Sequence, residues 1–251
     1  MKSLYYRIIS REKFGRIFID IGFIVQWLFD FNKRRRKLLW KIRPFTMVNY
    51  PRLKNIYEIC KKVEEEKLKG SFVECGVWKG GCSAIMAKIS QKYGNKRKIY
   101  LFDSFQGLPE TSEKDGINAK IFSENKSNGM LISINKNVAK LSDVKELFFK
   151  RLDIENKNIK FCKGWFQETI PKEKKGIGEI AILRLDGDWY ESTKFCLENL
   201  YNQVVKGGYI IIDDYGFWEG CKRAVDEFFK ERKIKPNLIK IDISGVYLIK
   251  D

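Results

Sequence analysis

The chain is 251 residues long, which suits one large domain with a buried core and a short extension. Its 49 lysines and arginines exceed its 32 aspartates and glutamates, giving a formal net charge of +17. That charge would attract nucleic acid, anionic membranes or phosphorylated substrates. The lysines are dispersed, however, and no motif of a nucleic-acid-binding module is present, so we do not expect nucleic acid as the partner.

The titratable residues limit which groups can act as a general base or bind a metal. The chain has no histidine, which removes the commonest general base and the commonest transition-metal ligand. Acid–base chemistry must therefore use carboxylates, lysine, tyrosine or a bound metal. The six cysteines form no Cys-x-x-Cys pair, and Cys75, Cys162 and Cys196 lie in apolar segments. We expect buried free thiols and a cytoplasmic protein.

Residues 1–45 are basic and aromatic, and an apolar run at 17–31 is interrupted by acids and followed by KRRRK. The run is shorter than the ~20 residues that span a bilayer, and it lacks the small-residue cleavage site of a secretory signal. Two interpretations stay open. Residues 17–37 lie on the anionic inner face of a membrane, or this helix packs on the domain or on a second copy in a homodimer.

An amphipathic helix is predicted at 53–68, followed by a short strand that turns through glycines into a helix. The turn, Glu74-x-Gly76-x-x-x-Gly80, lacks the third glycine of the dinucleotide fingerprint, which disfavours NAD. The next strand ends in Asp103, 27 residues after Gly76, where an acid can bind ribose hydroxyls. An S-adenosylmethionine site, which has no phosphate to hold, needs only such a loose turn.

The middle of the chain combines a polar segment with aromatic residues. Residues 107–137 lack apolar periodicity, and we expect a mobile lid or substrate loop there. A helix at 142–150 and a strand at 159–162 follow. In the next turn, Trp165 and Phe166 either flank an adenine or pack in the core.

Three carboxylates follow two apolar runs. Asp186 ends the first run, and Asp213 and Asp214 follow the second, 27 residues after Asp186, the spacing of a βαβ unit. The carboxyl ends of neighbouring parallel strands meet at the sheet edge where ligands collect. Hard cations such as Mg²⁺ prefer oxygen ligands, so these acids predict a metal site. Asp188, two residues before a helix, is predicted to cap it.

The remaining elements complete an α/β sheet. The strands before these acids are predicted at 179–186 and 208–213, and a helix is predicted at 219–232. Two short strands at 238–241 and 245–249 follow one another closely. Such a pair predicts one antiparallel strand at the edge of an otherwise parallel sheet.

Six motifs in chain order carry a resemblance to a known family: FVECGVWKGG, LFDSFQGLPE, GWFQETIP, LRLDGDWYEST, GGYIIIDDYG and SGVY. From about Met47 to its end the chain resembles the macrocin O-methyltransferase family, whose members methylate sugar hydroxyls with S-adenosylmethionine and Mg²⁺. The resemblance implies the class I methyltransferase fold, a doubly wound, mostly parallel, Rossmann-like sheet of seven strands. Cys82 stands where this family often has a small hydroxyl residue, a role that we assign to Ser83.

These observations give a set of expected roles. Asp186, Asp213 and Asp214 hold Mg²⁺, and Asp186 also accepts the proton of a sugar hydroxyl. Residues 1–68 form a helical extension for acceptor, dimer or membrane contacts, and residues 69–251 form the methyltransferase domain. The expected cofactor-binding residues are Glu74, Gly76, Val77, Ser83, Asp103, Ser104, Gly164, Trp165 and Phe166.

Two other functions compete with methylation of a sugar on a glycoside or surface glycan. A nucleic-acid methyltransferase would use the basic surface for phosphate contacts. A membrane-associated scaffold of a glycan-assembly complex would keep the fold without turnover.

Overall fold

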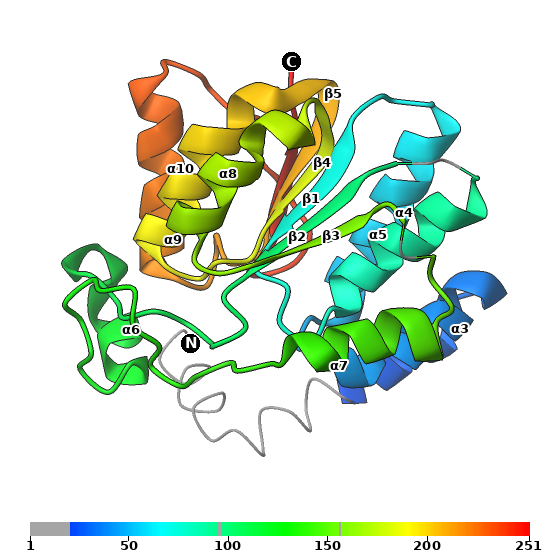
Figure 1. Cartoon of the computed structure of the whole chain (residues 1–251), viewed down its shortest axis with the longest axis horizontal. Coiled ribbons are helices and arrows are strands. Elements are labelled where there is room, and N and C mark those ends of the chain that lie inside the picture. The colour runs from blue at the N-terminus through cyan, green and yellow to red at the C-terminus, as the bar shows by residue number, and fades with distance from the viewer. Residues whose placement is uncertain (1–20, 95–96, 156) are drawn as a thin grey trace.

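The computed structural model describes residues 21–94, 97–155 and 157–251. A seven-stranded sheet in the order β3-β2-β1-β4-β5-β7-β6 forms its middle layer (Figure 1). The strands β1 to β5 run parallel, and β7 runs antiparallel between β5 and β6. The predicted doubly wound, mostly parallel sheet is therefore confirmed. The strands are β1 Ser71–Cys75, β2 Ile99–Asp103, β3 Ile159–Lys163, β4 Ile180–Leu185, β5 Val204–Ile212, β6 Ile239–Lys240 and β7 Val246–Ile249.

Helices cover both faces of the sheet (Figure 1). One face carries α3, α4, α5 and α7, and the other carries α8, α9 and α10. The helices are α3 Lys33–Ile42, η1 Arg43–Phe45, α4 Tyr50–Glu65, α5 Gly81–Lys92, η2 Glu113–Asp115, α6 Gly116–Phe122, α7 Leu141–Lys145, the π-helical η3 Glu146–Arg151, α8 Phe166–Ile177, α9 Tyr190–Leu200, η4 Tyr201–Gln203 and α10 Glu219–Glu231. None of the described helices is long and apolar enough to cross a membrane.

The central strands are apolar because both of their faces are covered. Successive side chains of a strand point to opposite faces. Phe72 and Ile182 therefore pack in the core beneath α4 and α5, whereas Val73 and Leu183 pack in the core beneath α9 and α10. All residues of β1 and β4 are buried, which explains why these strands are mostly apolar and do not alternate. Their charged residues, Glu74 and Arg184, pair with each other.

Two segments differ from the sequence prediction. Residues 107–137 are not irregular throughout, since they contain η2 and α6 and pair Pro109 with Ser133. Phe122 of α6 lies edge-on to Trp189 and Trp218, with ring centroids 6.2 and 5.5 Å apart. These contacts with distant residues hold a short helix that has no apolar period of its own. The helix α8 was not predicted either, and it includes Pro171, which cannot donate a backbone hydrogen bond.

A buried ion pair fastens the first described residues to α4. The Asp30 carboxylate accepts hydrogen bonds from Nε and Nη2 of Arg35 at 2.6 and 2.5 Å and from the Tyr50 hydroxyl. Arg35 also pairs with Glu58. Burial raises the pKa of Asp30, but the hydrogen bonds from Arg35 and Tyr50 outweigh it and lower the pKa to about 2.

We expect Asp30→Asn to lower the free energy of unfolding by about 3 kcal/mol near neutral pH, since it leaves Arg35 without its buried partner. The pKa of Asp30 is lower in the folded chain than in the unfolded one. Its stabilisation should therefore be complete above about pH 5 and disappear as the pH falls towards 2. Urea denaturation of wild type and variant across this range measures the difference. Asp153→Asn, at an exposed aspartate, is the control, and an equal effect of both variants would contradict the assignment.

The carboxyl ends of β1 and β4 meet at Gly76. Its φ is +95°, and a Cβ atom there would lie 1.8 Å from the backbone oxygen of Asp186. The Gly76 N–H donates to Phe102, and the Asp186 N–H donates to Cys75, at 2.9 and 2.8 Å. Glycine is required here because three strand ends converge on one peptide.

We expect Gly76→Ala to lower the free energy of unfolding by about 3 kcal/mol or more, because an unfavourable φ is combined with overlap against fixed backbone. Gly94→Ala is a matched control, since Gly94 has φ +66° and no atom within 4 Å of an added Cβ. It should cost only about 1 kcal/mol. Thermal and urea denaturation compare the two, and equal losses would show that backbone crowding at Gly76 is unimportant.

Candidate functional site

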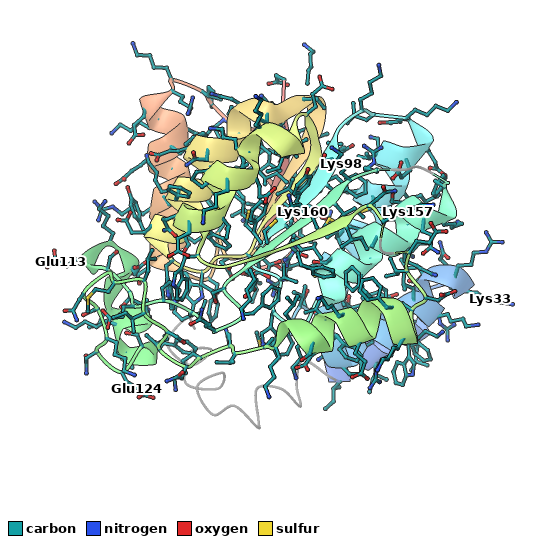
Figure 2. The ribbon with its side chains drawn as sticks, viewed as in Figure 1. Lys33, Lys98, Glu113, Glu124, Lys157 and Lys160 are labelled. Carbon is teal, nitrogen blue, oxygen red and sulfur yellow. The ribbon has the colours of Figure 1, made fainter. Side chains whose placement is uncertain are left out.

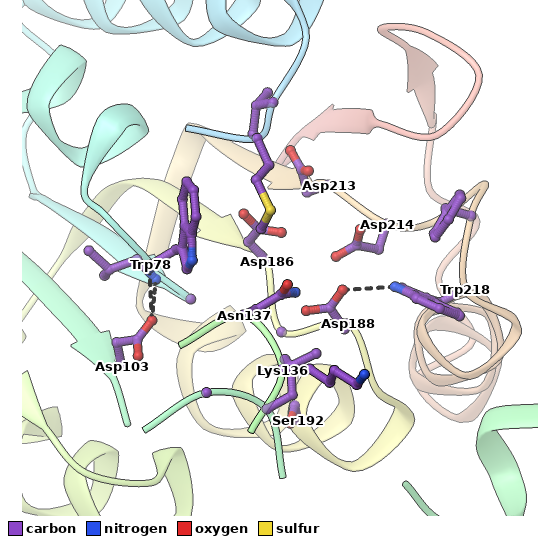
Figure 3. A pocket seen from close by; sticks show the side chains of 18 of the residues that line it. Trp78, Asp103, Lys136, Asn137, Asp186, Asp188, Ser192, Asp213, Asp214 and Trp218 are labelled. Carbon is purple, nitrogen blue, oxygen red and sulfur yellow. Dashed lines mark hydrogen bonds between the residues drawn. The ribbon is translucent and has the colours of Figure 1, made fainter. Parts of the chain in front are cut away.

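One pocket of about 1200 Å³ opens at the carboxyl ends of β1, β2, β4 and β5 (Figure 3). It is lined by all of the predicted cofactor and metal residues except Ser83. Ser83 is fully buried, and its hydroxyl donates to the Glu74 carboxylate. Cys82 faces the pocket instead. Ser83 therefore lies behind the pocket wall and positions Glu74.

Asp103 ties the end of β2 to the glycine turn. Its Oδ2 accepts hydrogen bonds from the backbone N–H groups of Val77 and Trp78 at 2.8 and 2.9 Å, and its Oδ1 accepts one from Phe105 at 2.6 Å. Burial raises the pKa of Asp103 although these three hydrogen bonds oppose the shift. A carboxylate has about four acceptor positions, so one is left for a ligand in the pocket.

Two further stretches border the same side of the pocket. Ser104 follows Asp103 and is fixed by a hydrogen bond from its hydroxyl to Gly107 at 2.8 Å. The predicted turn at Gly164 follows β3, and its N–H donates to the backbone oxygen of Asp103 at 3.0 Å. Trp165 and Phe166 come next and line the pocket. The structure thus brings these predicted residues together from the ends of β2 and β3.

Asp186, Asp213 and Asp214 converge on the other side of the pocket (Figure 3). One carboxylate oxygen of each lies within 4.8 Å of the others. Asp213 and Asp214 are only 4% and 7% exposed. The predicted convergence of three acids at the ends of β4 and β5 is therefore present in the structure.

Two arginines hold Asp186 and Asp213 in place, and neither was predicted. Arg184 is 2% exposed and donates to Glu74, Asp186 and Asp213 at 2.6, 2.8 and 2.6 Å. Arg52 of α4 binds Asp213 and also pairs with Asp242 at 3.1 Å. Arg184 is a charged residue inside an apolar strand. Because a buried charge needs a partner, that position was the available signal in the sequence.

Asp188 is a fourth carboxylate of this cluster, and its prediction as a helix cap is wrong. The N-terminal cap of α9 is Trp189, whose side chain makes no capping hydrogen bond. Asp188 has φ +58° and accepts a hydrogen bond from the Trp218 indole N–H at 2.8 Å (Figure 3). Burial and the charge of Asp186 raise the pKa of Asp188 to about 8.

The cluster has features that fit a divalent cation. Within the described part of the chain, Oδ2 of Asp214 is buried without a hydrogen-bond partner. Burial and the nearby charges of Asp188 and Asp186 raise the pKa of Asp214 well above its ordinary value. The cluster thus contains four carboxyl groups, of Asp186, Asp188, Asp213 and Asp214, but only the two guanidinium groups of Arg184 and Arg52. A cation with oxygen ligands would satisfy the unpaired oxygen and offset the excess negative charge.

The remaining pocket wall comes from separate parts of the chain. Residues 45–48, just after α3, line the pocket together with α6 and with the segment that leads into α10. Trp218 of that segment packs against Trp189, with ring centroids 4.9 Å apart. An aromatic wall therefore stands beside the carboxylates.

Comparison with known proteins agrees with this arrangement. The model of the family described as Macrocin-O-methyltransferase (TylF) matches residues 22–250. Demethyldecarbamoylnovobiocin O-methyltransferase of Streptomyces niveus is 35% identical over 209 residues, 83% of this chain and 76% of that protein. The 8-demethyl-8-(2,3-dimethoxy-alpha-L-rhamnosyl)-tetracenomycin-C 4'-O-methyltransferase of Streptomyces olivaceus is 33% identical with the same coverage.

A solved structure leads to the same family. The O-methyltransferase NovP is 35% identical to this chain and superposes with a TM-score of 0.71 over 82% of each chain. The family match extends over nearly all of the described residues and includes every strand of the sheet. This chain therefore belongs to the macrocin O-methyltransferase family and is an O-methyltransferase.

Proposed function

We propose that this chain transfers a methyl group from S-adenosylmethionine to a sugar hydroxyl of a glycoside or surface glycan, with Mg²⁺ as cofactor. One observation carries the proposal: the Asp103 turn and the acidic cluster line opposite sides of a single pocket. The relative from Streptomyces olivaceus is named for 4'-O-methylation of a compound that carries a rhamnosyl group, which supports a sugar as acceptor.

Residues on the β1, β2 and β3 side would bind the methyl donor. S-adenosylmethionine supplies a methyl group bound to a positively charged sulfur. Asp103 would accept a hydrogen bond from a ribose hydroxyl at its remaining acceptor position, and the rings of Trp165 and Phe166 offer flat faces to the adenine. Glu74 lines the pocket, but its carboxylate is held by Ser83 and Arg184. Its contribution would be to keep Arg184 in position.

We expect Asp103→Ala to weaken the binding of S-adenosylmethionine about a hundredfold, because hydrogen bonds to a charged group each contribute about 1.5–3 kcal/mol. Isothermal titration calorimetry measures the affinity without any acceptor. Asp153→Asn, at an exposed residue that does not line the pocket, should bind normally. A melting temperature close to that of wild type would show that the turn still folds, and unchanged affinity would remove Asp103 from the donor site.

Asp186, Asp213 and Asp214 would hold Mg²⁺. Bound Mg²⁺ supplies a Lewis acid and a template that orients neighbouring hydroxyls. Arg184 and Arg52 fix the carboxylates of Asp186 and Asp213 before any ligand arrives. This fixed geometry would place the acceptor hydroxyl close to the methyl donor, which is a large part of catalysis in a two-substrate transfer.

The proton of the acceptor hydroxyl needs a base, and two carboxylates qualify. Asp186 is the candidate from the sequence, but it already accepts a hydrogen bond from Arg184 and would also hold the metal. Asp188 accepts a hydrogen bond from Trp218, and its other oxygen points towards Asn137 (Figure 3). Among the described residues the Asp188 carboxylate has no guanidinium partner, and it is not needed to hold the metal, so we propose Asp188 as the proton acceptor.

We expect EDTA to abolish methyl transfer and Mg²⁺ to restore it, measured with labelled S-adenosylmethionine and a panel of glycosides with neighbouring hydroxyls. Asp213→Asn and Asp214→Asn should each weaken Mg²⁺ binding at least about tenfold in calorimetry, because each removes an anionic oxygen ligand. Activity that survives EDTA would contradict the metal requirement.

Asp188→Asn provides the matched contrast within the same cluster. It should keep Mg²⁺ affinity within a few fold but lower the rate of methyl transfer about 10²–10⁴-fold, the usual contribution of a general base. Asp186→Asn should lose both metal binding and turnover. An Asp188→Asn variant with normal turnover would return the base to Asp186.

The two competing functions predict different results. A nucleic-acid methyltransferase would bind RNA in a salt-dependent manner, but the buried carboxylates beside the pocket would repel a phosphate backbone. A scaffold without turnover would bind S-adenosylmethionine and methylate none of the glycosides. The methyl-transfer and calorimetry assays, together with RNA binding measured at low and high salt, therefore separate all three possibilities.

A further inference from the structure

The helical residues 21–28 have two apolar faces, and only one of them is packed. Phe23 lies edge-on to Tyr50 with ring centroids 5.2 Å apart, and Trp27 contacts Trp40 at 4.8 Å. The opposite face, at three- and four-residue spacing, is 42–55% exposed and consists of Ile21, Ile24, Val25 and Leu28. A helix on a protein surface ordinarily presents polar residues to water.

The exposed apolar surface continues into the following turn. Phe29 is 74% exposed and Phe31 is 94% exposed. Isolated exposed apolar residues are common, but a contiguous group of this size marks a contact site. We name Ile21, Ile24, Val25, Leu28, Phe29 and Phe31 the apolar face.

A basic face lies on α3, whose Trp40 packs against Phe23 and Trp27 of the helical residues 21–28. Lys33, Arg34, Lys37 and Lys41 are exposed and fall on one side of that helix by their spacing. Figure 2 shows Lys33 projecting away from the body of the molecule. The one acid in residues 21–41 is Asp30, and it is buried against Arg35. The surface therefore combines apolar and positively charged groups without an exposed carboxylate from these residues.

We propose that the apolar face and the basic face together form a docking surface for an anionic membrane. Apolar side chains enter the boundary between headgroups and acyl chains, while lysines and arginines contact anionic headgroups. A second copy of the chain fits this surface less well. A two-fold contact would bring the basic face close to its own copy and place like charges together. Residues 17–20 of the segment expected to reach the membrane lie outside the described residues.

Membrane docking does not depend on the methyl-transfer chemistry, but only a short stretch of chain separates the docking surface from the pocket. The chain leaves α3 through η1, and residues 45–48 immediately line the pocket. The stretch of chain that forms this part of the pocket wall therefore follows closely on the proposed docking surface.

Vesicle sedimentation with the full-length chain tests the proposal. The chain should sediment with vesicles of phosphatidylcholine and phosphatidylglycerol, and it should stay in the supernatant with phosphatidylcholine alone. High salt should release it, because exposed charges are screened. Lys33→Glu, Arg34→Glu and Lys37→Glu together should weaken partitioning by about fivefold or more for each basic residue removed. The double variant Phe29→Ser, Phe31→Ser should also be released.

Control variants carry the same chemical changes on other surfaces. Lys172→Glu, Lys175→Glu and Lys233→Glu reverse three exposed charges elsewhere, and Ile234→Ser with Ile243→Ser removes two exposed apolar side chains. Both controls should sediment like wild type. Circular dichroism and melting temperature verify that every variant is folded.

Three results would overturn the proposal. The first is no sedimentation with phosphatidylglycerol vesicles, and the second is an equal loss of binding in the control variants. The third is a dimer, seen by sedimentation equilibrium, that Phe29→Ser with Phe31→Ser dissociates in a protein that binds no vesicle. That result would assign the surface to a second copy of this chain.

Discussion

A buried guanidinium organises the floor of the pocket. Arg184 reaches from β4 to Glu74 on β1, to Asp186 at its own strand end and to Asp213 after β5. Burying this charge is unfavourable unless its hydrogen bonds are made, so the three strand ends are held in a fixed relation. Burial raises the pKa of Glu74 to about 7 despite the opposing charge of Arg184. The hydrogen bonds of Arg184 therefore fix the pocket floor, although burying these charged groups is itself unfavourable.

The same arrangement gathers more carboxyl groups than guanidinium groups. Arg184 and Arg52 face Glu74 and the carboxylates of the cluster, and Asp214 has an oxygen with no protein partner in the described chain. A protein that only needed a stable floor would have no use for these additional acids, because each is destabilised by burial beside like charges. The arrangement is understandable when a cation completes it, as functional sites often sacrifice stability for ligand binding.

The features that could be predicted from the sequence are those that depend on local residue patterns. The sheet and the acids at the ends of β4 and β5 follow from apolar runs that stop at charged residues, and Asp103 was found in the same way. Asp188 was misassigned because spacing alone cannot distinguish a cap from a residue with positive φ that points into a pocket. The helix α6 was missed because it is stabilised by Trp189 and Trp218, which are distant in the sequence.

The pairing of Asp30 with Arg35 changes what this acid implies about the surface around it. Within an apolar run, an acid argues against a surface that contacts lipid, because interfacial helices keep acids away from their apolar side. Arg35 takes the Asp30 carboxylate into the protein, since neither charge can be buried alone. The surface of residues 21–41 is thereby left apolar on one helix and basic on the next. In both places a buried charge is paired with an opposite charge. Arg184 is paired with the acids of the pocket floor, and Asp30 is paired with Arg35 beneath the exposed surface.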